Sequence, residues 1–131
     1  MNDLILLLGS DPGIRNAIAR TLEAKDYCVL ATGDIGAAVD LLRKQQFNLL
    51  IVRPYLESIS GHDAAIYLRR QSPGIPVLIV SGFFQDVDME ATEAAKEFYT
   101  FPKPFTAAEL VSRVREVLIK SSAHISMPAT L

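Results

Sequence analysis

The sequence predicts an α/β domain of the flavodoxin-like type, a (βα)5 three-layer sandwich whose five-stranded parallel sheet has the order 2-1-3-4-5. Two observations predict it. Short apolar runs alternate with segments of helical period along most of the chain. The runs that end at Val52 and Val80 are apolar at successive positions, which is typical of parallel strands covered on both faces. Right-handed crossovers then place helices on both faces of the sheet.

The strands are expected where apolar and β-branched residues cluster between polar stretches. The central one ends at Arg53, a charged residue that directly follows a buried-type run. In chain order, the expected strands are Leu4–Leu8, Tyr27–Ala31, Asn48–Val52, Val77–Val80 and Phe98–Phe101.

The first helix is expected to begin after Asp11, a plausible N-cap, with Pro12 at its first position. It should run to about Lys25. Its apolar residues recur at the helical period, so its polar residues should face water. These polar residues are Arg15, Asn16, Arg20 and Glu23.

Two further helices follow the same logic. Asp34 can cap a helix that runs to about Lys44. A third helix is expected over Gly61–Arg70, and Ser72, Pro73 and Gly74 should end it.

The last part of the chain contains two more expected helices. The fourth lies between Asp86 and Lys96 and is poor in large apolar residues, so it should be the least stable element. The fifth starts at a capping box formed by Thr106 and Glu109. We expect residues 1–120 to form the domain and residues 121–131, from Ser121 onward, to be a frayed tail or the start of a linker.

Composition limits the function classes. The chain has 131 residues, of which 50% are hydrophobic and 21% charged, which suits one globular domain with its own core. The net charge of −2 and the absence of a basic run argue against direct binding of nucleic acid. The single cysteine, Cys28, is expected to be a buried core thiol. No apolar run approaches membrane-spanning length, so we expect no membrane contact and a cytoplasmic location.

Several motifs fall at mutually compatible distances along residues 3–120. They are Asp11–Arg15 after the first strand, Gly61 at the third helix, Ile75–Ser81 over the fourth strand, and Lys103–Phe105 before the last helix. On these motifs the chain resembles the receiver domain of bacterial two-component response regulators. The resemblance implies the same flavodoxin-like fold and a role in signal transduction by phosphorelay.

The resemblance also implies a site, which this sequence departs from. In the family two acidic residues bind magnesium, an aspartate accepts the phosphoryl group, and a hydroxyl and a lysine respond to it. By position the acidic pair falls on Gly9 and Ser10, and the acceptor falls on Arg53. The hydroxyl and the lysine are retained as Ser81 and Lys103.

The aromatic switch residue of the family is also replaced. By position it falls on Thr100, and the neighbouring Tyr99 has the opposite strand parity. A shift of one residue would bring Asp11 to the second acidic position, but it would displace the Pro12 and Arg15 anchors. Even then, Asp11 would more readily pair with the nearby cations than bind a metal.

Charge at this site argues against a metal ion or cofactor. The family site carries about −2, whereas Arg53 and Lys103 give about +2 here. Arg53 is expected to act as a fixed cation, bonded to Asp11 or to loop carbonyls, that holds strand ends together. The alternative is an anion or small-metabolite sensor in which Arg53, Ser81 and Lys103 bind the ligand.

We therefore expect a degenerate, phosphorylation-independent pseudo-receiver that acts as a protein-interaction module. The implied partners are a histidine kinase, an effector or an output domain, or a second copy of the chain. The expected contact face spans the fourth helix, the fifth strand and the last helix. Its residues are Met89, Glu93, Lys96, Tyr99, Arg113 and Glu116.

An enzyme is not expected, because turnover needs an acid, a base or a nucleophile. The chain offers no Gly-rich phosphate loop, no Ser-His-Asp set and no carboxylate pair at the strand ends. His62 and His124 lack partners at zinc-ligand spacing.

Overall fold

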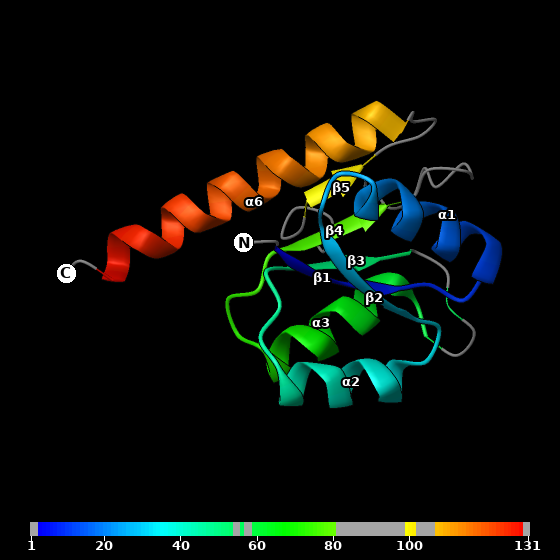
Figure 1. Cartoon of the computed structure of the whole chain (residues 1–131). Coiled ribbons are helices and arrows are strands. Elements are labelled where there is room, and N and C mark those ends of the chain that lie inside the picture. Colours follow the sequence, from blue (N-terminus) through cyan, green and yellow to red (C-terminus); the bar gives the residue numbers. More distant parts are fainter. Residues whose placement is uncertain (1–2, 54–55, 57–58, 81–98, 102–106, 130–131) are drawn as a thin grey trace.

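The sheet has the predicted strand order, β2-β1-β3-β4-β5, and all neighbouring strands run parallel (Figure 1). The computed structural model describes residues 3–53, 56, 59–80, 99–101 and 107–129, with backbone alone for 99–101 and 121–129. Its elements are β1 (Leu4–Leu8), α1 (Pro12–Glu23), β2 (Cys28–Thr32), α2 (Ile35–Lys44), β3 (Leu49–Val52), α3 (Gly61–Gln71), β4 (Val77–Val80), β5 (Tyr99–Phe101) and α6 (Ala107–Ala129). The fold class is therefore confirmed.

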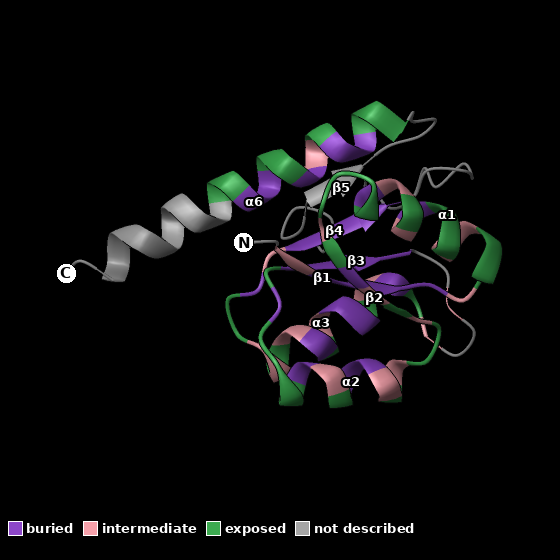
Figure 2. Ribbon diagram, in the orientation of Figure 1, coloured by how far each residue is buried: buried purple, intermediate pink, exposed green. Residues whose placement is uncertain are grey.

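Alternate residues of the central strands supply two separate apolar cores. Figure 2 shows that β3 and β4 are buried along their length. On one face, Ile5 and Ile51 pack with the inner stripes of α1 and α6. On the other face, Leu6 and Leu50 pack with α2 and α3. Because successive strand residues point to opposite faces, an unbroken apolar strand is needed to fill both cores. This requirement explains why β1, β3 and β4 lack polar positions.

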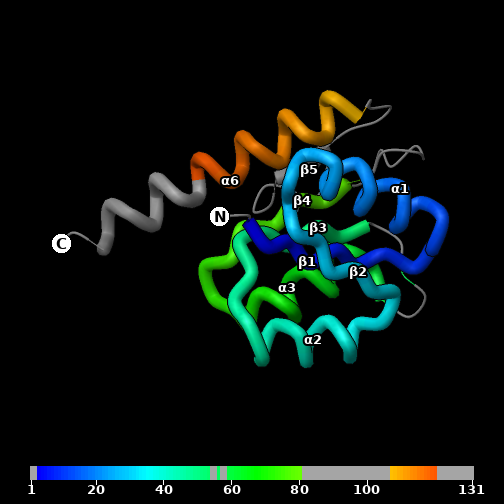
Figure 3. The backbone as a smooth tube through the Cα atoms, viewed as in Figure 1, coloured from blue at the N-terminus to red at the C-terminus, as the bar shows by residue number. Residues whose placement is uncertain are grey.

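The path of the chain follows from these two faces (Figure 3). After β1 the chain crosses through α1 on one face, and after β2 and β3 it crosses through α2 and α3 on the other. The carboxyl ends of β1, β3 and β4 consequently lie along the same edge of the sheet. No helix in the described part of the chain has the length and apolar content needed to cross a bilayer.

Several expected details need correction. β3 begins at Leu49 rather than Asn48, whose side-chain oxygen accepts a hydrogen bond from the Leu4 N–H at 2.8 Å. Cys28 is exposed, not buried, because it is the first residue of the edge strand β2.

At the carboxyl end of the chain, α6 continues to Ala129, so the segment expected to fray is helical. The domain boundary at residue 120 stays a prediction. The expected fourth helix between Asp86 and Lys96, and Thr106 of the capping box, lie outside the described residues.

Candidate functional site

The carboxyl ends of three parallel strands meet where the sequence places Gly9 and Arg53. The Arg53 backbone N–H donates to the Leu8 carbonyl at 3.0 Å, which continues the β1–β3 pairing by one residue. The Gly9 N–H donates to the Thr32 carbonyl at 3.1 Å and joins the end of β1 to that of β2. Ligands of open parallel sheets bind beyond these strand ends, so this edge is the candidate site.

The Arg53 side chain is buried, with 6% of its surface exposed. Its Nη1 donates to the carbonyl of Val80, the last residue of β4, at 2.5 Å. A charged donor is among the stronger partners a carbonyl can have. The guanidinium thus joins the end of β4 to the end of β3. The expected partners were Asp11 or loop carbonyls, whereas this carbonyl belongs to a strand residue.

Gly9 makes room for this arrangement. A β-carbon placed on Gly9 would lie 2.8 Å from Arg53 Cγ, closer than side chains approach one another. The Arg53 side chain therefore passes over the end of β1 in space that a larger residue would occupy. Sequence reasoning placed both residues at the site but did not predict this contact.

The Asp11 side chain bonds to the first turn of α1. Its Oδ1 accepts hydrogen bonds from the backbone N–H groups of Gly13, at 2.8 Å, and Ile14, at 3.2 Å. The residue has extended backbone dihedrals and caps α1, as predicted. The Asp11 carboxylate is therefore hydrogen-bonded to the N-terminus of α1.

Arg15 does not face water as expected. It is half-buried, and its Nη1 donates to the Gly9 carbonyl at 2.6 Å. Gly33 permits this path, because a β-carbon there would lie 2.6 Å from Arg15 Nη1. The guanidinium of Arg15 therefore lies over the carboxyl ends of the strands, because the Gly9 carbonyl accepts its hydrogen bond and Gly33 leaves space for it.

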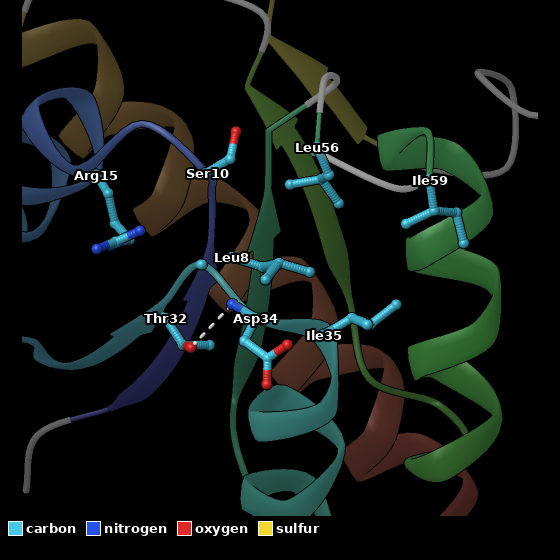
Figure 4. A pocket seen from close by; sticks show the side chains of 9 residues that line it. Leu8, Ser10, Arg15, Thr32, Asp34, Ile35, Leu56 and Ile59 are labelled. Atoms are coloured by element: carbon cyan, nitrogen blue, oxygen red, sulfur yellow. Dashed lines mark hydrogen bonds between the residues drawn. The ribbon is translucent and has the colours of Figure 1, made fainter.

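A cavity of about 480 Å³ opens beside these residues, between the ends of β1 and β2 and the segment before α3 (Figure 4). Arg53 is not part of its wall. Its lining residues are Leu8, Ser10, Arg15, Thr32, Gly33, Asp34, Ile35, Leu56 and Ile59. Of these, sequence reasoning singled out Ser10 as a site position. Leu56 and Ile59 come from a distant loop whose approach no local pattern reveals.

Asp34 forms one wall of this cavity and also caps α2, as predicted. Its Oδ2 accepts from the Ala37 N–H at 3.0 Å, and its own N–H donates to Thr32 Oγ1 at 3.1 Å. These bonds hold the turn between β2 and α2 in one conformation. The carboxylate is therefore fixed at the cavity wall.

Other predicted site residues are only partly described. Ser81 and Lys103, and Met89, Glu93 and Lys96 of the expected contact face, lie outside the described residues. The backbones of Tyr99 and Thr100 pair with Leu78 and Ile79 of β4. Among the described residues, no group of three or more His, Cys, Asp and Glu side chains lies together.

Arg113 and Glu116 of the expected contact face form an ion pair on α6, with 2.9 Å between Nη1 and Oε1. Lys120 Nζ lies 3.8 Å from the same carboxylate oxygen. Ile119, beside this pair in sequence, is 62% exposed and was not predicted as part of the face.

Comparison with known families gives one match over most of the chain. The model of the response regulator receiver domain matches residues 5–115. Among curated proteins, a probable transcriptional regulatory protein TcrX of Mycobacterium tuberculosis is 26% identical over 116 residues, 87% of this chain and 49% of its own length. The cell cycle response regulator CtrA of Brucella ovis is 27% identical over 123 residues, 92% and 52% respectively. The chain thus spans about half the length of the curated relatives it matches.

Solved structures agree on the fold. NtrX from Brucella abortus superposes with a TM-score of 0.86 at 22% identity, covering 100% of this chain and 30% of that one. A CheY-like response regulator receiver domain protein from Methanospirillum hungatei gives a TM-score of 0.82 at 18% identity, covering 95% and 99%.

Proposed function

The chain belongs to the response regulator receiver family, and we propose that it is a phosphorylation-independent member, a pseudo-receiver that works as a protein-interaction module in signal transduction. The observation that carries the proposal is the buried Arg53 side chain, which reaches across Gly9 to the Val80 carbonyl. The motif spacing supports this, because it would put Arg53 at the family's acceptor aspartate and Gly9 at one of its acidic positions. A guanidinium has no nucleophilic oxygen and cannot accept a phosphoryl group.

The residues at this edge also do not fit a magnesium ion. Mg²⁺ takes oxygen ligands in near-octahedral geometry, usually with one or two carboxylates. At the family's acidic positions Gly9 has no side chain and Ser10 has a hydroxyl, while the carboxylate of Asp11 caps α1. A buried cation beside them disfavours a second one. No phosphoryl chemistry through a metal is therefore proposed here.

Signalling would then depend on docking. We propose that the contact face includes Met89, Glu93, Lys96, Tyr99, Arg113 and Glu116. The partner would be a histidine kinase, an effector, an output domain or a second copy of the chain, in the cytoplasm. Two relatives are named as regulatory proteins and are about twice as long as the matched region. Any contact with nucleic acid would accordingly come through an output domain rather than through this one.

The alternative of an anion sensor built on Arg53, Ser81 and Lys103 is less well supported. The Arg53 side chain is buried and already donates to Val80, so its capacity for an external anion is reduced. A saturable thermal shift with phosphate-bearing metabolites, lost in the variant Arg53→Met, would favour the sensor.

The first test is phosphoryl acceptance. The protein is incubated with Mg²⁺ and acetyl phosphate, and separately with Mg²⁺ and beryllium fluoride, and followed by intact mass and amide NMR. We expect no phosphoryl mass increase and an unchanged spectrum. A receiver domain that has its acceptor aspartate serves as the positive control. A mass gain that is lost on treatment with hydroxylamine, as acyl phosphates are, would overturn the proposal.

The second test concerns the docking face. Arg113→Glu combined with Glu116→Arg reverses both charges but keeps an oppositely charged pair on α6. We expect it to weaken self-association or binding of a purified cognate kinase in sedimentation experiments. Arg20→Glu, on the exposed part of α1, is the matched control and should bind normally. Equal binding by all three proteins would exclude this part of α6 from the interface.

A further inference from the structure

We propose that the cavity between α1, α2 and the segment before α3 binds a small zwitterion with an apolar body, the chemistry of an apolar amino acid. This ligand binding is separate from the proposed docking function, and the cavity wall contains none of the residues of the proposed contact face. The volume, about 480 Å³, lies within the range of small-molecule pockets. Such pockets combine an apolar wall with a few fixed polar groups, and both are present here.

Two opposite charges line the cavity. Arg15 Nη1 donates to Gly9 and Asp34 Oδ2 accepts from Ala37, so both side chains are held in place. Within the described part of the chain, no ion pair joins Arg15 to Asp34. The second nitrogen Nη2 of Arg15 and Oδ1 of Asp34 make no hydrogen bond with a described residue. Each group therefore keeps capacity for a ligand.

The polar and apolar parts of the wall are on different sides (Figure 4). Ser10, Arg15, Thr32 and Asp34 gather on one side, whereas Ile35, Leu56 and Ile59 lie on the other, with Leu8 at the centre. A ligand with both charges at one end and a branched or aromatic body at the other matches this arrangement. Its carboxylate would face Arg15 and Ser10, its ammonium group would face Asp34, and its body would cover the aliphatic side chains.

The balance of charge selects the class. An anion without an amino group would be attracted by Arg15 and repelled by Asp34. A cation without a carboxylate would be attracted by Asp34 and repelled by Arg15. A zwitterion gains from both groups. Charge-assisted hydrogen bonds at each end also make a neutral isostere a poor replacement, because it leaves a charged group unmatched.

The test is an amide NMR titration of the whole chain with L-leucine and L-phenylalanine. Three probes each lack one feature: 4-methylpentanoic acid lacks the amine, isopentylamine lacks the carboxylate, and glycine lacks the apolar body. We expect saturable shifts at Ser10, Gly33, Ile35 and Leu56 with leucine or phenylalanine, and about tenfold weaker binding or none with the other probes.

Variants decide whether the named groups hold the ligand. Arg15→Gln removes the positive charge and keeps a polar side chain, and Asp34→Asn keeps the cap of α2. Each should weaken binding about tenfold, whereas Arg20→Gln, exposed on the same helix, should not change it. Melting curves of the three variants test whether each one is folded.

Other outcomes overturn the inference. No saturable shift with either amino acid would show that the cavity does not take this class. Equal binding of 4-methylpentanoic acid or isopentylamine would show that the paired charges do not select the ligand. Unchanged affinity in Arg15→Gln and Asp34→Asn would place binding elsewhere. None of these results alters the phosphoryl-acceptance test, so the two proposals can fail separately.

Discussion

The side chain of Arg53 lies so close over Gly9 that a side chain at position 9 would collide with it: a β-carbon on Gly9 would lie 2.8 Å from Arg53 Cγ. Cγ is near the main chain of a buried residue and has little freedom to move away. The absence of a side chain at the end of β1 and the long side chain directly after β3 thus depend on each other.

This relationship predicts coupling between substitutions. Gly9→Ala should destabilise the protein by about 1–3 kcal/mol, since the new methyl group overpacks a filled space. In the background of Arg53→Ala the same substitution should cost at least about 0.5 kcal/mol less. Urea denaturation of the four proteins of the cycle measures the coupling.

Gly74→Ala is the matched control, because Gly74 has a φ of +89° and no atom within 4 Å of an added β-carbon. It should destabilise through backbone strain, by about 1 kcal/mol, equally in both backgrounds. Additive free energies for Gly9→Ala and Arg53→Ala would contradict the close approach.

The bond from Arg53 to Val80 predicts a second effect. Arg53→Met keeps most of the volume but leaves the buried Val80 carbonyl without this donor, at a cost of about 1–3 kcal/mol. Arg53→Lys should recover part of the loss because it restores a charged donor. Hydrogen exchange of the β4 amides gives a local measurement. If Arg53→Met and Arg53→Lys are equally stable, the bond contributes little.

The cap of α1 predicts a third effect. Asp11→Ala removes the acceptor of the Gly13 and Ile14 N–H groups and should cost about 1 kcal/mol. Asp11→Asn should be nearly neutral, because asparagine caps about as well. Asp40→Ala, exposed within α2, is the control and should change the unfolding free energy by less than about 0.5 kcal/mol. A loss in Asp40→Ala equal to that in Asp11→Ala would argue against a capping effect.

The central strand predicts a fourth effect. Leu50 is completely buried in the core beneath α2 and α3, so Leu50→Ala should cost about 2–5 kcal/mol. Ile119 is 62% exposed on α6, and Ile119→Ala should change stability by less than about 0.5 kcal/mol. Thermal or urea unfolding compares them. Similar losses would mean that Ile119 is covered, as it would be in a dimer that uses α6.

The fold was predictable because its signals are local. Apolar runs without alternation identified β3 and β4 as strands buried on both faces. Asp11 and Asp34 marked two helix starts. The predicted burial of Cys28 was wrong, because apolar neighbours in the sequence do not reveal that a strand lies at the edge of a sheet. The helical state of residues 121–129 was not predicted, because the polar and small residues of this segment are also typical of a frayed tail.

The site was predictable only in outline. A charged residue directly after a buried strand placed Arg53 at the sheet edge, but its path over Gly9 depends on the spacing between two strands. Arg15 follows the helical period of a solvent-facing residue, yet an open carbonyl on Gly9 and the absent side chain of Gly33 redirect it. The cavity is lined by three segments that are distant in sequence, residues 8–15, 32–35 and 56–59, so no linear pattern predicts it.

The exposed thiol of Cys28 has a practical consequence for all these measurements. It is the single cysteine of the chain, so a maleimide fluorophore or spin label would attach at one position without mutagenesis. Cys28 begins β2, whereas Arg53 and the cavity lie beyond the carboxyl ends of the strands. A reporter on Cys28, at the amino end of its strand, would follow association or ligand uptake without contacting Arg53 or the cavity.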